Sequence, residues 1–211
     1  MLRALRSARV RRTTATGAAA LMAGAAVIGL AGPAWADTHV HATYKVTGST
    51  YIKAPNFTMT LGPGTLASTL DANTGKLTAK LTLPEATGSF KQYNIVPVTA
   101  TTQFINDGPT TGTLSLKTGA VKTTSKITLR IVSLVVGGIP VPVGSSCETT
   151  DPVVVTVTSQ PKFNILKGGN LAGSYTIGDF GGCGLATLLI NLTLPGSGNT
   201  ITLTLGKAKL G

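Results

Sequence analysis

Two histidines stand one residue apart in the stretch AWADTHVHA, and they are the only histidines of the 211-residue chain. If the chain is cleaved before Asp37, the new terminus reads Asp37-Thr38-His39. A free amine, two backbone amides and an imidazole at this spacing can hold Cu(II) or Ni(II) in a tetragonal site. His41 lies on the same side of an extended segment and can add a ligand. The alternative interpretation is an exposed polar segment that leads into the first strand.

Residues for enzymatic catalysis are few. A serine nucleophile lacks the Gly-x-Ser-x-Gly setting, and its base would be a histidine close to the amino terminus. Glycosidases hold two carboxyls about 5 to 9.5 Å apart across a cleft, and Glu148 and Asp151 are the only close pair of acids. A glycosidase cleft is rich in aromatic residues that stack on sugars. The only tryptophan of the chain is Trp35, which precedes Asp37 and is lost if the chain is cleaved there. The acids beyond Asp37 occupy turn or loop positions: Asp71, Glu85, Asp107, Glu148, Asp151 and Asp179. We therefore expect no enzyme activity.

Cys147 and Cys183 are the only cysteines. Outside the cell an even pair of cysteines usually closes a disulfide. A catalytic thiol would need a histidine or a cluster of positive charge beside it, and both histidines are far away in the sequence. We therefore predict a structural disulfide between Cys147 and Cys183, which restricts the unfolded chain by roughly 3 to 4 kcal/mol on the entropic model.

Residues 1–36 have the layout of a secretory signal peptide with a short signal helix. An apolar run over 18–30 is followed by Ala34-Trp35-Ala36, the small-x-small pattern of a cleavage site. The run is about 13 residues, whereas a helix needs roughly 20 to span a bilayer. Basic residues without a single acid lead the chain: Arg3, Arg6, Arg9, Arg11 and Arg12. We predict cleavage before Asp37, a secreted or envelope-associated protein, and no transmembrane helix in the mature chain.

Cleavage would remove five arginines from a chain of formal net charge +11 and leave 13 basic against seven acidic residues, a net charge of +6. The remaining lysines are spread along the chain, and neither clustering nor interleaved aromatics indicates a nucleic-acid binder. Lys122, Lys126 and Arg130 project from one side of a predicted strand. They form a candidate contact for an anionic cell-envelope polymer or lipid, or for another envelope protein. The alternative is that the lysines only keep the surface soluble.

Threonine alternates with aliphatic residues through most of the chain after Asp37. This period of two predicts strands with one polar and one apolar face, and β-branched residues favour such surfaces. The clearest segments are 76–83, 121–131 and 200–205. Turn sequences predict hairpins at 71–75, 117–119 and 195–199. About ten to twelve short strands result, and no helical periodicity is present.

Because most predicted strands have one polar face, antiparallel sheets solvated on one side fit better than a parallel sheet covered by helices. We predict an all-β fold, an antiparallel β-sandwich with one disulfide. Asn106-Asp107-Gly108-Pro109 is the strongest internal turn and can separate two subdomains near 107–111. The composition does not change across this turn, so we expect a single domain over 37–211.

The most distinctive stretches lie in the last third of the chain: GIPVPVGSSCETTDP (138–152), GSYTIGDFGGCG (173–184) and PGSGNT (195–200). Together with the arginine-led, alanine-rich leader, they resemble a group of small exported actinobacterial proteins that are β-rich and of unassigned function. The resemblance implies export and a disulfide-linked β scaffold. It carries over no functional residue.

The leading hypothesis is an exported, non-enzymatic β domain, a cell-envelope-associated or secreted protein with a binding or structural role. A second is a membrane-active β-barrel or pore, since alternating strands also line barrels; few aromatics and the prolines of 139–143 argue against it. A third is a carrier of an apolar ligand held between sheets, drawn from the apolar runs 132–136 and 185–190; core packing explains these runs equally well. The fourth is Cu(II) binding through the processed amino terminus.

Overall fold

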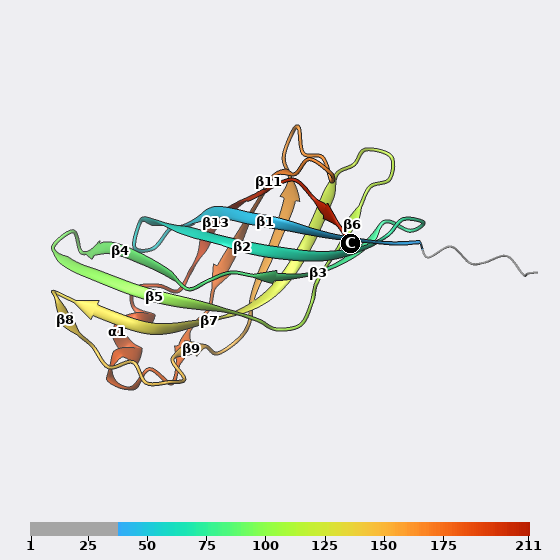
Figure 1. Ribbon diagram of the computed structural model, residues 1–211. Helices are drawn as coiled ribbons and strands as arrows, with labels where there is room; N and C mark the ends of the chain where they lie inside the picture. Colours follow the sequence, from blue (N-terminus) through green and yellow to red (C-terminus); the bar gives the residue numbers. More distant parts are fainter. Residues whose placement is uncertain (1–37) are drawn as a thin grey trace, which may run out of the picture. The chain divides into compact units, whose positions relative to one another are not determined.

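The computed structural model describes residues 38–211; the predicted signal peptide (1–36) and Asp37 lie outside the described residues. The chain from residue 37 onward forms one compact unit, built mainly of strands (Figure 1). The first strands are β1 (His39–Ile52), β2 (Phe57–Asp71), β3 (Lys76–Thr82), β4 (Ala86–Gln92), β5 (Val96–Asn106), β6 (Thr110–Leu114) and β7 (Val121–Val136). The later elements are β8 (Ile139–Pro140), β9 (Glu148–Thr149), β10 (Val153–Ser159), β11 (Gly169–Ile177), β12 (Phe180–Gly181), η1 (Gly184–Ala186), α1 (Thr187–Asn191), β13 (Gly196–Leu205) and β14 (Lys209–Leu210).

Eight of the strands close into a barrel. β7 pairs on one edge with β6 and on the other with β10, and the ladder continues from β10 through β11, β13, β1, β2 and β3 back to β6. All of these pairings are antiparallel. The predictions of an all-β antiparallel fold and of a disulfide between Cys147 and Cys183 are confirmed. The predicted β-sandwich is corrected to a closed barrel, because the hydrogen-bonded ladder returns to its starting strand.

The sequence pattern does not distinguish the two folds, because sandwich and barrel strands share the same polar and apolar alternation. Several strands are also longer than the sequence predicts. Of the 14 strands in the sheet, β1, β2 and β7 contain 14, 15 and 16 residues, whereas the sequence predicted ten to twelve short ones. The first half of β7 pairs with β6 and β10, and its second half pairs with β5, β8 and β9. This strand therefore belongs both to the barrel and to an extension beyond it.

Two glycines allow neighbouring barrel strands to approach closely. A Cβ atom at Gly48 in β1 would lie 2.2 Å from the carbonyl oxygen of Thr202 in β13. One at Gly173 in β11 would lie 1.9 Å from the carbonyl oxygen of Thr156 in β10. Side chains at these positions would push the strands apart, so glycine is needed for this close approach.

The barrel strands place aliphatic side chains inside and polar side chains outside. In β3 (KLTAKLT) every apolar residue is buried and every lysine and threonine is exposed. β13 repeats the pattern, with exposed threonines between the buried Ile201, Leu203 and Leu205. The outer surface of a transmembrane barrel is apolar. The polar exterior of these strands is therefore the reverse of what the pore hypothesis requires.

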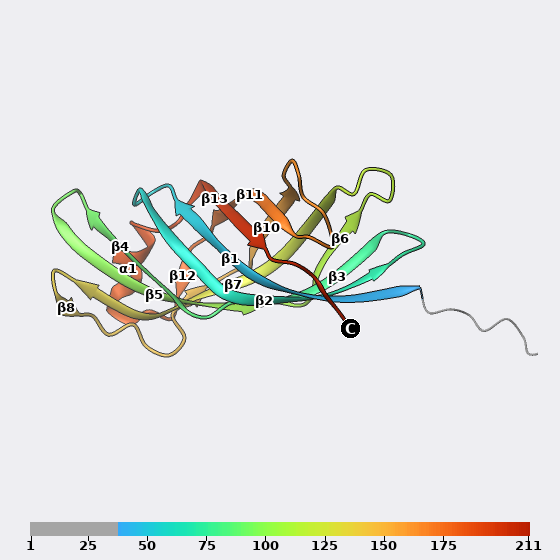
Figure 2. The ribbon, with the colours of Figure 1, turned by 45° about the horizontal axis from the view of Figure 1, so that its top comes forward.

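The apolar core has two parts. The first fills the barrel and includes Val46, Leu61 and Leu203. The second includes Ile131 and Leu134 and belongs to the extension beyond the barrel. This extension, hereafter the helical end, consists of β4, β5, the second half of β7, β8, β9, β12, η1 and α1. Figure 2 shows α1, β8 and the turn between β4 and β5 together at one end of the sheet.

Side chains rather than backbone hydrogen bonds join β2 to β4. Within residues 38–211, the ladder joins β4 only to β5. The rings of Phe57 in β2 and Phe90 in β4 stack with their centroids 5.1 Å apart. Gly88 lets the Phe57 ring lie on β4, because a Cβ atom there would be 2.2 Å from Cε2 of that ring. We call this contact the β2–β4 seam.

A short helical segment precedes β13, although the sequence periodicity predicts no helix. It is formed by η1 and α1, and α1 has only five residues, too few for a helical period to stand out. At its carboxyl end Thr193 donates its hydroxyl to the carbonyl oxygen of Leu189 (2.7 Å). No helix within residues 38–211 is long and apolar enough to cross a bilayer.

Two of the three predicted hairpin turns are confirmed, those that join β2 to β3 and β6 to β7. In the first, the carboxylate of Asp71 accepts hydrogen bonds from the backbone of Asn73 (2.9 Å) and Thr74 (3.2 Å). The third prediction, at 195–199, is wrong: this segment opens β13, where Asn199 pairs with Tyr175 of β11. The turn at 107–109 joins β5 to β6, and both strands pair with β7.

Candidate functional site

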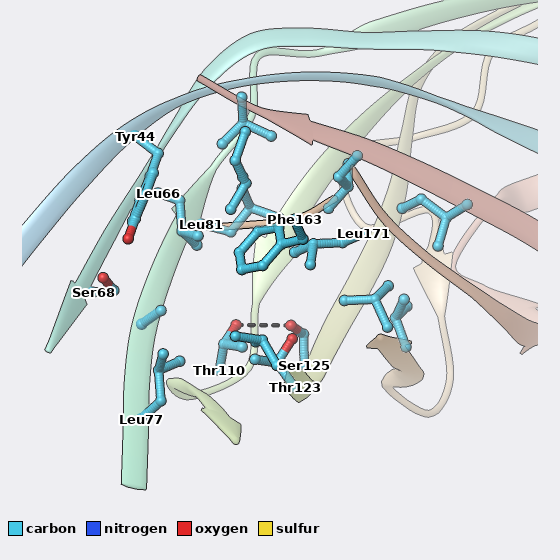
Figure 3. Close-up of a pocket in the computed structure, with 18 of the residues that line it drawn as sticks. Tyr44, Leu66, Ser68, Leu77, Leu81, Thr110, Thr123, Ser125, Phe163 and Leu171 are labelled. Atoms are coloured by element: carbon cyan, nitrogen blue, oxygen red, sulfur yellow. Dashed lines mark hydrogen bonds between the residues drawn. The ribbon is translucent and has the colours of Figure 1, made fainter. Parts of the chain in front are cut away.

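The barrel encloses an apolar cavity of about 60 Å³, hereafter the barrel cavity. Aliphatic side chains from the barrel strands form most of its wall, and Phe163, from the loop between β10 and β11, points into it (Figure 3). The hydroxyl of Tyr44 donates to the carbonyl oxygen of Ile165 (2.8 Å) and so holds this loop against β1. Burial raises the pKa of Tyr44.

A second cavity, of about 70 Å³, lies between the barrel core and the helical end, hereafter the seam cavity. Phe57 of the β2–β4 seam and Ala100 of β5 contribute to its wall. Tyr175 reaches it from β11, and the hydroxyl of Tyr175 shares a hydrogen bond with that of Thr50. Burial raises the pKa of Tyr175, and the hydrogen bond with Thr50 partly offsets this effect.

The cavities form a series. Four side chains contact both the barrel cavity and the seam cavity: Leu81, Ile127, Val155 and Ile201. Ala100 and Leu194 contact both the seam cavity and a third space of about 20 Å³ beneath α1, hereafter the helix cavity. Leu189 and Ile190 of α1 form one side of the helix cavity. Apolar space separated only by single side chains therefore runs from the barrel to α1.

The polar side chains in these walls bond to the protein. In the barrel cavity the hydroxyls of Thr110 and Ser125 lie 2.7 Å apart (Figure 3), and Ser68 donates to the carbonyl oxygen of Ala42 (3.1 Å). Within residues 38–211, no buried side-chain nitrogen or oxygen lacks a hydrogen-bond partner. An occupant of the cavities would therefore meet apolar surface, and its binding energy would come from apolar contact.

Empty apolar space lowers stability. At roughly 24 cal/mol per Å³, the cavities of 60 and 70 Å³ cost about 3 kcal/mol together. That is a large fraction of the roughly 5 to 15 kcal/mol that holds a typical domain folded. An engineered apolar cavity of about 150 Å³ stays dry and takes up benzene or xenon. An apolar occupant would recover part of the lost contact energy.

Cross-links hold the helical end over these cavities. The disulfide joins Cys147, just before β9, to Cys183, just before η1. The side-chain amide of Asn191 bonds to both backbone groups of Phe180, accepting from its N–H (2.8 Å) and donating to its carbonyl (3.0 Å). Both α1 and the loop before β9 are thereby tied to β12. The helical segment closes the series of cavities at this end.

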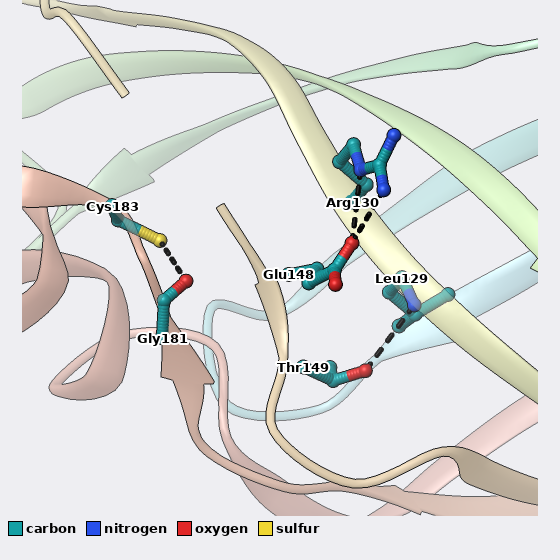
Figure 4. Close-up of polar contacts among 6 residues, drawn as sticks. All are labelled: Leu129, Arg130, Glu148, Thr149, Gly181 and Cys183. Atoms are coloured by element: carbon teal, nitrogen blue, oxygen red, sulfur yellow. Dashed lines mark hydrogen bonds and ion pairs between the residues drawn. The ribbon is translucent and has the colours of Figure 1, made fainter. Parts of the chain in front are cut away.

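One residue of the candidate basic contact takes part in an ion pair. Lys122 and Lys126 are exposed on the outer face of β7, as expected. Arg130 lies on the same face, but its Nε and Nη2 donate to Oε2 of Glu148 (2.9 and 2.7 Å) in β9 (Figure 4). The ion pair neutralises Arg130 and also engages Glu148, one member of the only close pair of acids in the sequence. The contact stays a prediction for the two lysines.

The histidines lie at the start of β1. His39 stands opposite Asp71 in β2, and the imidazole Nδ1 of His41 is 3.1 Å from the hydroxyl of Thr69. The carbonyl oxygen of Thr38 accepts a hydrogen bond from the amide of Ala72 (2.9 Å). A tetragonal chelate would use the amide nitrogens of Thr38 and His39, and this hydrogen bond engages the carbonyl oxygen instead.

Asp37, the first residue of the predicted Cu(II) site, lies outside the described residues. Within residues 38–211, no three side chains of the His, Cys, Asp and Glu types gather in a way that could hold a metal. Cu(II) binding through Asp37, His39 and His41 stays a prediction.

Neither a protein-family model, nor a curated protein, nor a solved structure matches this chain. The function is therefore argued from the geometry of the molecule.

The apolar surface of the helical end was not predicted. The apolar run 185–190, which suggested either an apolar ligand or core packing, is divided between two faces. Leu189 and Ile190 face the helix cavity, while Leu185 and Leu188 are exposed. The spacing of leucines at 185, 188 and 192 is the signal that could have indicated one face of a helix.

Proposed function

We propose that the mature chain is an exported, non-enzymatic binding protein that holds a slender apolar chain in the barrel and seam cavities. The observation that carries this proposal is the series of three apolar cavities that runs from the barrel interior to α1. The energetic cost of this empty space supports a role for it, since a core selected only for stability would fill it.

The cavity volumes indicate the size of the ligand. An apolar cavity of about 150 Å³ takes up benzene, and the cavities of 60 and 70 Å³ approach that size when joined. Drug-sized ligands need roughly 300 to 1,000 Å³, which disfavours bulky polycyclic molecules. We infer that the ligand is a straight alkyl segment of about six carbons, because a cavity that holds benzene holds six carbon atoms. A short-chain alcohol or the end of a longer acyl chain has this form.

Export and the absence of catalysis are part of the same proposal. The signal-like leader supports export, and a disulfide is typical of an oxidising compartment. The salt bridge of Glu148 to Arg130 occupies a carboxylate that paired-acid catalysis would need. Turnover of a glycan or ester panel that is lost in Glu148→Gln or Asp151→Asn would contradict the non-enzymatic assignment.

Xenon and hexan-1-ol test the cavities directly. We expect both to bind residues 37–211, xenon by ¹²⁹Xe chemical shift and hexan-1-ol by calorimetry. Ala79→Leu, which extends a side chain of β3 into the barrel cavity, should reduce xenon binding. Ala100→Leu should reduce hexan-1-ol binding, because Ala100 lies where the seam and helix cavities meet. Ala67→Leu, on the exposed face of β2, is the control and should change neither. Equal binding by all variants would contradict the proposal.

A contact with the cell envelope is a second candidate function. Two exposed lysines, Lys122 and Lys126, lie on one outward face of β7, as an anionic polymer or lipid would require. Co-sedimentation with native cell envelope should fall when both are changed to glutamate. Co-sedimentation that is unchanged, or that does not occur for the original chain, would contradict this contact.

A further inference from the structure

Exposed apolar side chains gather on the helical end from three separate segments. Leu185 is fully exposed, and Leu188 and Leu192 are 71% and 69% exposed. Tyr93 and Ile95 at the turn between β4 and β5 are each 78% exposed, and Ile139 of β8 is 69% exposed. Exposed apolar residues scattered singly are ordinary, but a contiguous group marks a surface that binds something.

Backbone contacts bring these segments together. The amide of Gly137, which precedes β8, donates to the carbonyl oxygen of Pro97 in β5 (2.8 Å), and Ile139 pairs with Val136. The turn between β4 and β5 and the strand β8 therefore flank the end of β7 on its two edges. α1 packs against the same strands, since its inner side chains share the helix cavity with Val98 of β5 and Leu134 of β7. Figure 2 shows all three segments at one end of the sheet.

The three segments carry no charge. The sequences at 92–97 (QYNIVP), 137–146 (GGIPVPVGSS) and 184–198 (GLATLLINLTLPGSG) contain no Asp, Glu, Lys or Arg, in a chain of which 12% is charged. Two lysines and one acid stand at the border. Asp179 precedes Phe180, to which α1 is hydrogen-bonded, and Lys91 precedes the first segment. Lys53 lies beside the last, with its Nζ 3.3 Å from where a Cβ atom of Gly198 would be. This uncharged group of turns with lysines at its border is hereafter the end face.

We infer that the end face docks on the surface of an anionic lipid bilayer, with the leucines of the helical segment at the level of the acyl chains. The inference rests on the proposed function and names the source of its ligand, because the helical segment separates this surface from the helix cavity. Apolar side chains that enter the headgroup boundary and lysines that remain at its edge are the features of interfacial binding. An acyl chain that passes α1 would reach the seam cavity without crossing water.

A bilayer fits this surface better than a second copy of the chain does. The end face combines two turns with the outer side of the helical segment. Its exposed polar side chains are uncharged: Tyr93, Asn94, Ser145, Ser146 and Ser197. A fluid bilayer accommodates an irregular surface of this kind, whereas a protein partner would need a complementary shape. The lysines at the border favour anionic headgroups, and a second positively charged copy would bring them into repulsion.

Partition onto vesicles of phosphatidylglycerol and phosphatidylcholine tests the inference with residues 37–211. We expect binding that falls more than tenfold in the double variant Leu188→Asp and Leu192→Asp. The matched control is Leu166→Asp with Leu210→Asp, two exposed leucines outside the helical end with Lys167 and Lys209 beside them in the sequence. This control should bind vesicles as the original chain does. Equal loss in both double variants, or no binding by the original chain, would overturn the inference.

A single tryptophan gives a second measurement that needs no change of charge. Because Trp35 is the only tryptophan of the chain, Leu188→Trp places one reporter on the end face. Its fluorescence should shift to the blue on addition of vesicles, and that of Leu166→Trp should not. Equal shifts in both, or none in Leu188→Trp, would contradict bilayer docking. A dimer in solution that dissociates in the Leu188→Asp and Leu192→Asp variant would assign the face to self-association instead.

Hexan-1-ol in solution separates this inference from the function on which it rests. If the aspartate double variant loses vesicle binding but keeps hexan-1-ol binding, both the docking surface and the cavities are supported. If vesicles bind but hexan-1-ol does not, the cavity proposal fails and the docking surface remains. If hexan-1-ol binds but vesicles do not, only the docking inference fails.

Discussion

The barrel and the helical end enclose apolar cores of similar composition, but they are closed by different means. Backbone hydrogen bonds run around the whole barrel, through eight strands. The helical end has no such ring: a stacked pair of rings joins β2 to β4, and a disulfide and the amide of Asn191 fix its helical segment. A closed ladder opens only when many hydrogen bonds break together, whereas side-chain contacts open a few at a time.

This difference locates the entrance to the cavities. Local opening of lowest free energy is expected where few backbone hydrogen bonds cross the boundary, and this condition holds at the β2–β4 seam and around α1. The exposed apolar surface lies at the same end. Under the proposed function, the barrel would be the rigid container, and the helical end would be the part through which the ligand enters.

Removal of the disulfide should have the largest effect. In the double variant Cys147→Ala and Cys183→Ala, we expect the free energy of opening of the helical end to fall by about 3 to 4 kcal/mol, because the cross-link closes a loop in the unfolded chain. Hydrogen exchange measures this at the amide of Ile131, which donates to the carbonyl oxygen of Cys147 (2.8 Å). Amides of β1 that exchange without unfolding of residues 147–183 should keep their protection, because the cross-link acts only on states in which this loop is open. Unchanged exchange at Ile131 would contradict the prediction.

Truncation of the barrel core should act on the whole molecule. Leu61, 1% exposed, also lines the seam cavity, and Leu61→Ala should lower the free energy of unfolding by about 3 kcal/mol. Urea unfolding followed by circular dichroism measures the change, and hydrogen exchange should accelerate in β1 and at Ile131 alike. A loss confined to the helical end would contradict the role of the barrel as the rigid part.

Filling the barrel cavity should stabilise the protein. Ala79→Leu adds apolar atoms to an empty space, so we expect a gain of about 1 kcal/mol in the free energy of unfolding. Ala67→Leu adds the same atoms to an exposed position and should change stability by less than about 0.5 kcal/mol. Thermal unfolding compares the two. Destabilisation by Ala79→Leu would mean that the cavity is too narrow for added atoms and for a ligand.

The smallest effect concerns pH at the barrel edge that faces away from the helical end. Hydrogen bonds from the Thr74 hydroxyl and the Asn73 backbone hold the pKa of Asp71 below its usual value of 3.8. A lowered folded-state pKa contributes stability above the unfolded value, and that contribution is lost as the pH falls through the folded value. The melting temperature of the Asp71→Asn variant should therefore fall less between pH 5 and pH 2 than that of the original chain. If the melting temperatures of both proteins fall by the same amount over this pH range, the prediction is wrong.

The sequence predicts the structure well where the outcome depends on residue type and spacing alone. Alternation over 76–83 places each side chain of β3 on the correct face, and the two cysteines pair as expected. Closure of the barrel depends instead on hydrogen bonding between strands that are far apart in the sequence. Polar and apolar residues alternate in the same way in a sandwich and in a barrel.

The candidate site was hidden for the same reason. The sequence gives no sign that Arg130 is paired, because its partner Glu148 lies in β9, 18 residues further along the chain. The apolar run around Leu188 gives no sign that this side chain is exposed. It is exposed because Leu189 and Ile190 face the helix cavity and Leu188 lies on the other side of α1. Cavities are invisible in a sequence, since they are the space that side chains from distant strands fail to fill.

Calorimetric titration of hexan-1-ol into residues 37–211 and into the Ala100→Leu variant tests the central claim most directly. The account predicts saturable binding of one molecule to the original chain and at least a tenfold loss in Ala100→Leu, with the fold unchanged by circular dichroism. Absence of saturable binding to the original chain, or equal affinity for both proteins, would contradict it.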